Sequence, residues 1–175
     1  MKLAETNIAG VFVIRGTRWV DGRGRVDVCF EREVFYAHEL EADWNRSLLV
    51  ESYQKGTIRG LHYQIAPNAE TKLVKCVSGV IFDVVVDVRP ASPTYGKAQW
   101  FYLTGETDEM LYIPEGVAHG YQTLQSSWVH YLIAGAYAKD CARGLSWDSP
   151  TLAIPWPITE PILSGGDATL PWFTP

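Results

Sequence analysis

One short run of the sequence places a cation close to a group that can act as a general base. The run Arg59-Gly60-Leu61-His62-Tyr63-Gln64 ends a stretch rich in strand-forming residues. Arginine binds phosphates through charge-assisted hydrogen bonds, and histidine exchanges a proton near neutral pH. Gly60 would permit a bulge that turns Arg59 and His62 toward one cavity. The alternative is a surface arginine beside a core histidine that is satisfied by hydrogen bonds.

A second histidine follows a turn signal. Residues Pro114-Glu115-Gly116-Val117-Ala118-His119-Gly120 have the spacing P-x-G-x-x-H, which is that of the second motif of cupin barrels. A turn at Pro114–Gly116 would deliver His119 onto a strand that points into the mouth of a barrel. The alternative here is a structural turn followed by a buried histidine.

Two further residues carry little weight alone. Lys72 begins the strand-like run KLVKCV, where a lysine is usually solvated. Tyr131 shares one face of an alternating pattern with Val129, Ile133 and Tyr137, and a tyrosine in such a strand more often packs than reacts.

The histidine count disfavours a metal site. Many cupins bind a metal through two histidines two positions apart, a carboxylate and a third histidine, but Gln64 occupies the second of these positions. Since His38 and His130 lie in unrelated runs, His62 and His119 are left as two ligands, short of the usual three or four. We therefore expect no metal.

The elements that must position these residues are predicted to be short strands. Alternation is clearest over 79–89, where Val80, Phe82 and Val84 lie on one face and Asp83 and Asp87 on the other. Similar runs occur at 10–15, 26–30, 47–53, 57–64, 72–77, 98–104, 110–113 and 128–135. This punctuated pattern is typical of an all-β sandwich or barrel.

Helical and extended segments are predicted at the periphery. Residues 31–44 have the composition of one short helix. The tail from Pro150 to Pro175 is expected to wrap the barrel in an extended form, with Trp156, Trp172 and Phe173 as anchors.

Length and composition fit one globular domain over residues 1–175. The net charge of −5 and the lack of a basic stripe argue against nucleic acid as a partner. Neither a signal peptide nor a run long enough to cross a membrane is present, so we expect no membrane association. Three widely spaced cysteines, Cys29, Cys76 and Cys141, indicate reduced thiols and a cytoplasmic location.

Five blocks together resemble the dTDP-4-dehydrorhamnose 3,5-epimerases, in the family's order and spacing. They are RGLHYQ at 59–64, KLVKCVSGVIFDVVVDVRPASPTYGKAQ at 72–99, YIPEGVAHGYQTL at 112–124, GLSWDSPTLAIPWP at 144–157 and LSGGD at 163–167. The resemblance implies a cupin-type jelly-roll barrel with short peripheral helices. It also implies an enzyme that acts without a cofactor and usually forms a homodimer with strands exchanged between subunits.

The resemblance also implies roles for single residues. His62 stands at the position of the base, Asp167 at that of its partner, Tyr131 at that of the acid, and Lys72 at that of the lysine near the substrate oxygen. The substrate-binding positions are occupied by Arg59, His119, Tyr137 and the phosphate-binding Arg23.

The first third of the chain departs from the family pattern. Val26 and Val28 stand where relatives have an aromatic residue and an acid that contact the nucleotide base. The stretch before the RGLH block lacks the family's amides, with Leu49 among the replacements. A buried polar ligand group that faces such a side chain would lose a hydrogen bond, which costs roughly 1–3 kcal/mol.

These observations support three functional hypotheses. The leading one is epimerisation at C3, or at C3 and C5, of a nucleotide-linked 4-keto-6-deoxy sugar. The second applies the same residues to isomerisation or cyclisation of a non-sugar natural-product intermediate, which the changes at Val26, Val28 and Leu49 favour. The third is a non-catalytic sugar-binding cupin, which would not need a base, an acid and a lysine together.

Overall fold

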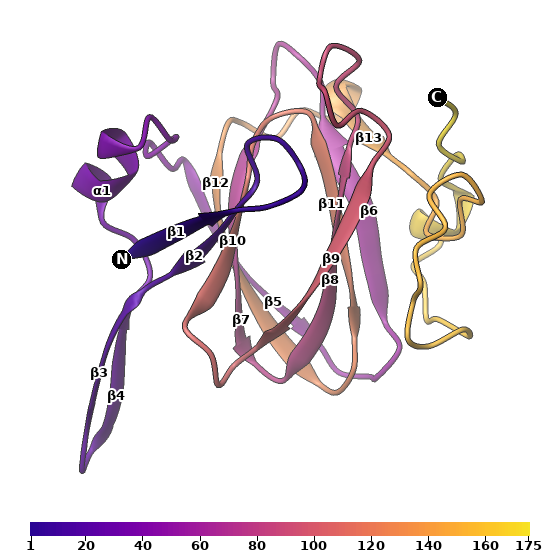
Figure 1. Cartoon of the computed structure of the whole chain (residues 1–175). Coiled ribbons are helices and arrows are strands. Elements are labelled where there is room, and N and C mark those ends of the chain that lie inside the picture. Colours follow the sequence, from indigo (N-terminus) through magenta and orange to yellow (C-terminus); the bar gives the residue numbers. More distant parts are fainter.

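Two antiparallel sheets face each other in the computed structural model, which describes residues 1–175 (Figure 1). The six-stranded sheet has the order β1 (Lys2–Glu5), β2 (Phe12–Arg15), β10 (Glu109–Ile113), β7 (Thr71–Ser78), β12 (Ser127–Ala134), β5 (Arg46–Ser52). The five-stranded sheet has the order β13 (Ala142–Gly144), β6 (Ile58–Gln64), β11 (Val117–Thr123), β8 (Val80–Asp87), β9 (Ala98–Thr104). The predicted all-β class is confirmed.

Strand β8 is buried on both faces. Ile81 and Val85 belong to the core between the sheets, whereas Phe82 and Val84 pack beneath the C-terminal tail. Because side chains alternate along a strand, Asp83 lies on the same face as Ile81 and Val85 and is carried into the interior. The alternation predicted for 79–89 is therefore present, and its polar face points into the barrel.

The tail covers the outer face of the five-stranded sheet. Trp156 packs against Phe82, and Phe173 packs against Tyr95, so both serve as the predicted anchors. The same prediction was wrong for Trp172, which is 60% exposed and whose indole donates a hydrogen bond to Asp148.

Helical structure is confined to short segments. Helix α1 (Arg32–Ala37) is shorter than the predicted 31–44. The remainder of that stretch packs irregularly, with Trp44 edge-on to Phe35. Two 3-10 turns, η1 (Lys139–Cys141) and η2 (Asp167–Thr169), follow later in the chain. None of these helices is long and apolar enough to span a membrane.

One hairpin projects from the body of the molecule. Strands β3 (Thr17–Asp21) and β4 (Gly24–Val28) pair only with each other and extend away from the barrel (Figure 1). Strand β5 ends the six-stranded sheet and has β12 as its single neighbour. One edge of β5 therefore has no hydrogen-bonded strand beside it.

Candidate active site

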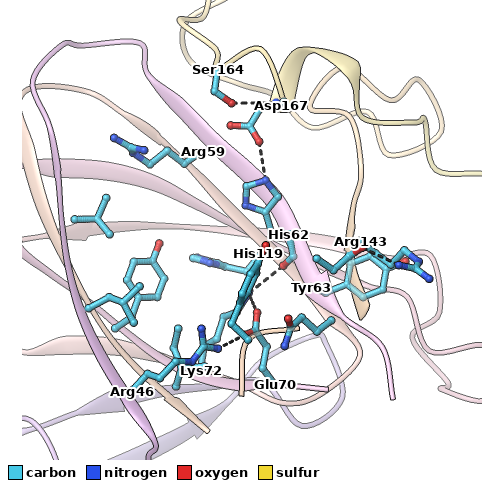
Figure 2. A pocket seen from close by; sticks show the side chains of 18 of the residues that line it. Arg46, Arg59, His62, Tyr63, Glu70, Lys72, His119, Arg143, Ser164 and Asp167 are labelled. Atoms are coloured by element: carbon cyan, nitrogen blue, oxygen red, sulfur yellow. Dashed lines mark hydrogen bonds and ion pairs between the residues drawn. The ribbon is translucent and has the colours of Figure 1, made fainter. Parts of the chain in front are cut away.

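A cavity of about 620 Å³ opens between the two sheets (Figure 2). Its walls come from β5, β7 and β12 of one sheet, from β6 and β11 of the other, and from the C-terminal tail. Most of the residues singled out in the sequence line it: Arg59, His62, Lys72, His119, Tyr131, Tyr137 and Asp167. The fold thus brings together side chains from segments more than one hundred positions apart.

His62 is held by a carboxylate from the tail. Its Nε2 lies 2.6 Å from Oδ1 of Asp167, and the backbone N–H of Asp167 donates to Ser164 Oγ at 3.0 Å (Figure 2). Burial raises the pKa of the Asp167 carboxyl, but its bonds to His62 and Ser164 outweigh burial and leave that pKa below its ordinary value. An ionised carboxylate only accepts hydrogen bonds, so Nε2 carries the proton and Nδ1 of neutral His62 keeps a lone pair.

A second histidine–carboxylate pair lies deeper. Nε2 of His119 is 2.6 Å from Oδ1 of Asp83, and both side chains are buried. Oδ2 of Asp83 is buried without a hydrogen-bond partner. The sequence analysis did not single out Asp83 as a site residue. The available signal was an acidic residue on a strand whose other residues are almost all apolar.

Gly60 allows β6 and β11 to approach closely enough to place both histidines. It has φ +109°, and a Cβ at this position would lie 2.6 Å from the carbonyl oxygen of His119. The register changes beside it, at the irregularity between His119 and Tyr121, and His62 is paired with His119. The P-x-G-x-x-H turn places His119 on β11, with Gly116 at φ +72° directly before the strand.

Tyr131 lies on β12, and its ring is edge-on to that of His119 with 5.8 Å between centroids. Burial raises the pKa of the Tyr131 phenol well above its ordinary value, and Tyr121 and Asp83 shift it in the same direction. The phenol therefore remains protonated through neutral and moderately alkaline pH. Such a group is available as a proton donor.

Lys72 is buried rather than solvated, with 6% of its surface exposed. Its Nζ donates to the carbonyl oxygen of His62 at 3.0 Å and lies 3.1 Å from Oε1 of Glu70. Burial lowers the pKa of the Lys72 ammonium, and the Glu70 carboxylate opposes that effect. The lysine thus presents an N–H donor in a poorly hydrated wall of the cavity.

Arg59 and Tyr137 lie toward the open side. The guanidinium of Arg59 donates to Ser52 Oγ at 2.9 Å and to the carbonyl oxygen of Glu51 at 3.1 Å. Gln64 holds the loop that bears Tyr137, because its amide donates to the carbonyl of Ala136 at 3.0 Å and accepts from the N–H of Ala138 at 2.8 Å. Both polar atoms of the Gln64 side chain, which stands where many cupins have a metal ligand, are therefore hydrogen-bonded to the backbone.

Arg23 does not join this group. It lies in the turn of the β3–β4 hairpin, its side chain is 91% exposed, and it pairs with Asp21 at 2.6 Å. Val26 lies on the same hairpin and is exposed. Val28 ends the hairpin and is partly buried.

The strand before the RGLH block differs from expectation in one respect. Leu49 was expected to face the ligand, but it is 58% exposed and pairs with His130 outside the cavity. Its neighbours Leu48 and Val50 line the cavity instead. A one-residue difference in register exchanges the two faces of a strand, and the sequence alone did not fix that register.

Arg46 and Glu70 also line the cavity and were not predicted. Arg46 Nη2 lies 2.7 Å from Glu70 Oε2. They occupy the start of β5 and the loop before β7, where charged residues are ordinarily surface residues, so the sequence offered no signal for them. No group of three or more His, Cys, Asp or Glu side chains is arranged to hold a metal ion.

Comparisons with known proteins agree with this geometry. A sequence profile of the family described as dTDP-4-dehydrorhamnose 3,5-epimerase matches residues 5–174. The dTDP-4-dehydrorhamnose 3,5-epimerase of Sinorhizobium fredii is 40% identical over 176 residues, covering 98% of this chain and 89% of the relative.

Solved structures give the same result. The crystal structure of the Bacillus anthracis dTDP-4-dehydrorhamnose 3,5-epimerase with TDP and PPi bound has a TM-score of 0.95 and 35% identity, covering 98% of this chain and 99% of that one. A 4-keto-6-deoxy sugar epimerase from the novobiocin gene cluster of Streptomyces spheroides has a TM-score of 0.93 and 32% identity, covering 98% and 87%. The predicted cupin-type jelly-roll fold is confirmed, and the protein is an enzyme of the isomerase class. The chain belongs to the dTDP-4-dehydrorhamnose 3,5-epimerase family.

Proposed function

We propose that the protein inverts C3, or C3 and C5, of a nucleotide-diphosphate-linked 4-keto-6-deoxy sugar by proton transfer between His62 and Tyr131. One observation carries the proposal: a histidine bound to a carboxylate, a partly buried phenol and a buried ammonium group line the same cavity. The names of the relatives supply the substrate class.

The first step is removal of a proton from the carbon beside the ketone. Nδ1 of His62 accepts the proton, the C–H electron pair moves into the carbon–carbon bond, and the carbonyl becomes an enolate. Asp167 stabilises the resulting imidazolium through its bond to Nε2. Lys72 donates a hydrogen bond to the enolate oxygen, where negative charge develops.

The second step returns a proton to the opposite face of that carbon. The Tyr131 O–H supplies it, the enolate electrons form the new C–H bond, and the ketone is restored. The phenolate then regains a proton from solvent while His62 loses one, so the protein ends unchanged. A protonated phenol is required, and the raised pKa of Tyr131 supports that state.

The remaining side chains are assigned to binding. Arg59 and His119, with Tyr137 at the cavity edge, contact the sugar and diphosphate in this proposal. A cavity of about 620 Å³ lies within the usual range for small-molecule sites. No residue of the proposed mechanism requires a cofactor.

Arg23 can reach a substrate only if it comes from another copy of the chain, so the proposal includes a homodimer. The free edge of β5 borders the cavity, and the projecting hairpin exposes Trp19, Val20 and Val26. Pairing the hairpin of one protomer with β5 of its partner would satisfy an open strand edge and cover these apolar side chains. Each protomer, residues 1–175, is taken as one domain, and its three free cysteines fit a cytoplasmic location.

Co-expression of two inactive variants tests the shared site. Arg23→Ala and His62→Ala are each expected to be impaired, but mixed dimers contain one site with both residues intact. Activity of roughly a quarter of the wild type should return, since half of the dimers are mixed and one of two sites in each is complete. No recovery in isolated mixed dimers would contradict the exchange.

The apolar wall of Leu48 and Val50 favours a second candidate, isomerisation or cyclisation of a non-sugar intermediate. Thermal-shift measurements with dTDP, GDP, UDP and CDP separate the two, because a ligand that binds the native state raises Tm by mass action. Stabilisation by dTDP supports the sugar-nucleotide function. No response to any nucleotide would exclude it in favour of the non-sugar substrate.

A further inference from the structure

A chain of charged contacts runs from one edge of the cavity to Lys72. Arg46 Nη2 lies 2.7 Å from Oε2 of Glu70, and the other oxygen of Glu70 lies 3.1 Å from Lys72 Nζ (Figure 2). We infer that Glu70 and Arg46 are positioning residues. Glu70 keeps Lys72 charged and oriented toward the substrate, and Arg46 partly offsets the stabilisation that the Glu70 carboxylate gives to the Lys72 ammonium. This inference rests on the proposed role of Lys72 beside the substrate carbonyl.

The contacts of Lys72 define its direction. An ammonium group has three N–H donors. One donates to the carbonyl oxygen of His62 at 3.0 Å, and the Nζ forms an ion pair with Glu70 at 3.1 Å. At least one N–H remains for a group inside the cavity that Lys72 lines. Because the first bond ends on the backbone of His62 itself, the same contacts fix Lys72 relative to the base.

Glu70 is in turn fixed from the other side. Arg46 binds its second oxygen, and Arg46 Nε donates to the carbonyl oxygen of Gly135 at 3.2 Å. The backbone N–H of Gly135 donates to Asn45 Oδ1 at 2.7 Å. These bonds join the start of β5, the end of β12 and the loop before β7, so the Glu70 carboxylate has little freedom to turn away from Lys72.

Charge balance around Lys72 explains why two partners are present. Burial disfavours the ammonium form, whereas Glu70 and the more distant Asp83 favour it, and Arg46 opposes them. The titratable and charged groups that face Lys72 from the elements around it are Glu70, Arg46 on β5, His62 on β6, Asp83 on β8, His119 on β11 and Tyr131 on β12. Glu70 is the one carboxylate of this set in direct contact with Lys72.

The two positioning residues should therefore shift Lys72 in opposite directions. Glu70→Gln removes the adjacent negative charge and should lower the pKa of Lys72 by about 1 unit or more. Arg46→Gln removes a cation and leaves Glu70 to Lys72 alone, so the pKa should rise. A residue that merely supported the fold would not produce shifts of opposite sign.

The test is an NMR titration of the lysine side chains of the folded protein, with the Lys72 signal assigned by its loss in Lys72→Met. The alkaline limb of the kcat/KM profile for epimerisation should move with the measured pKa, downward in Glu70→Gln and upward in Arg46→Gln. Glu109→Gln is the matched control, because it removes an exposed ion pair, 2.8 Å from Arg15, outside the cavity. It should leave the Lys72 signal unchanged.

Each outcome separates this inference from the proposed function. An unshifted Lys72 pKa in both variants of an active epimerase overturns the inference alone. An inactive wild-type protein would contradict the proposed function, while the titration would still report on the contacts. If Glu70→Gln fails to fold, Arg46→Gln alone tests the inference. An unchanged or lowered pKa of Lys72 in that variant overturns it.

Discussion

Nε2 of His62 lies 2.6 Å from Oδ1 of Asp167, although 105 positions separate the two residues in the chain. The contact exists because η2 in the C-terminal tail lies against β6 and brings Asp167 beside His62. The tail therefore does more than cover apolar surface, since its position against the barrel determines the tautomer and the orientation of His62.

Asp167→Asn should lower kcat by roughly 10²–10⁴, because a neutral amide no longer stabilises the imidazolium that forms when His62 takes the proton. Steady-state kinetics of epimerisation measure the effect. Asp148→Asn is the control: it alters a carboxylate just before the tail that accepts hydrogen bonds from Ser146 and Trp172 outside the cavity. Equal activity of the two variants would remove Asp167 from the mechanism.

Gly60→Ala should destabilise the protein by roughly 1–3 kcal/mol or more, since the added Cβ would meet the carbonyl oxygen of His119 at 2.6 Å and φ is +109°. Activity should fall as well, because the β6–β11 pairing places both histidines. Urea denaturation gives the free energy of unfolding. Gly165→Ala, whose Cβ would meet nothing within 4 Å, should be nearly neutral, and a similar loss there would contradict the argument.

Asp87 should contribute to stability in a pH-dependent way. Burial raises the pKa of its carboxyl, but bonds from Arg89, Ser92 and Thr94 outweigh burial and lower that pKa to about 2. An unfolded aspartate has a pKa near 3.9. The contribution is therefore complete above about pH 4 and is lost as pH falls through about 2.

Asp87→Asn should lower the free energy of unfolding at pH 7 by roughly 1–3 kcal/mol, since several hydrogen bonds to a buried charge are lost. The difference from the wild type should shrink as pH falls from 4 to 2. Urea denaturation at a series of pH values measures both. A difference that stays constant over this range would show that the carboxylate charge is not responsible.

The sequence predicted much of the barrel because short alternating runs and Gly–Pro turns are local signals. It missed β1, β3 and β13, which are short strands of three to five residues. The exposure of Trp172 was also missed. Its indole N–H donates a hydrogen bond to Asp148, a contact that depends on the fold.

Candidate site residues were predictable where a motif carried them. His62, His119 and Lys72 stand in blocks with recognisable order. Arg46 and Glu70 do not, because each looks like a surface charge until the fold places the two 2.7 Å apart beside Lys72. Leu48 and Val50, rather than Leu49, line the cavity because the register of β5 decides which of its side chains face inward. That register depends on pairing with β12, which the sequence does not show.

Solvent deuterium uptake at the carbon beside the ketone tests the central claim most directly. A dTDP-linked 4-keto-6-deoxy sugar would be incubated in D₂O with the wild type, His62→Ala and Tyr131→Phe, and followed by NMR. We expect no uptake with His62→Ala, and uptake without formation of the inverted sugar with Tyr131→Phe. Undiminished uptake with His62→Ala would contradict the account.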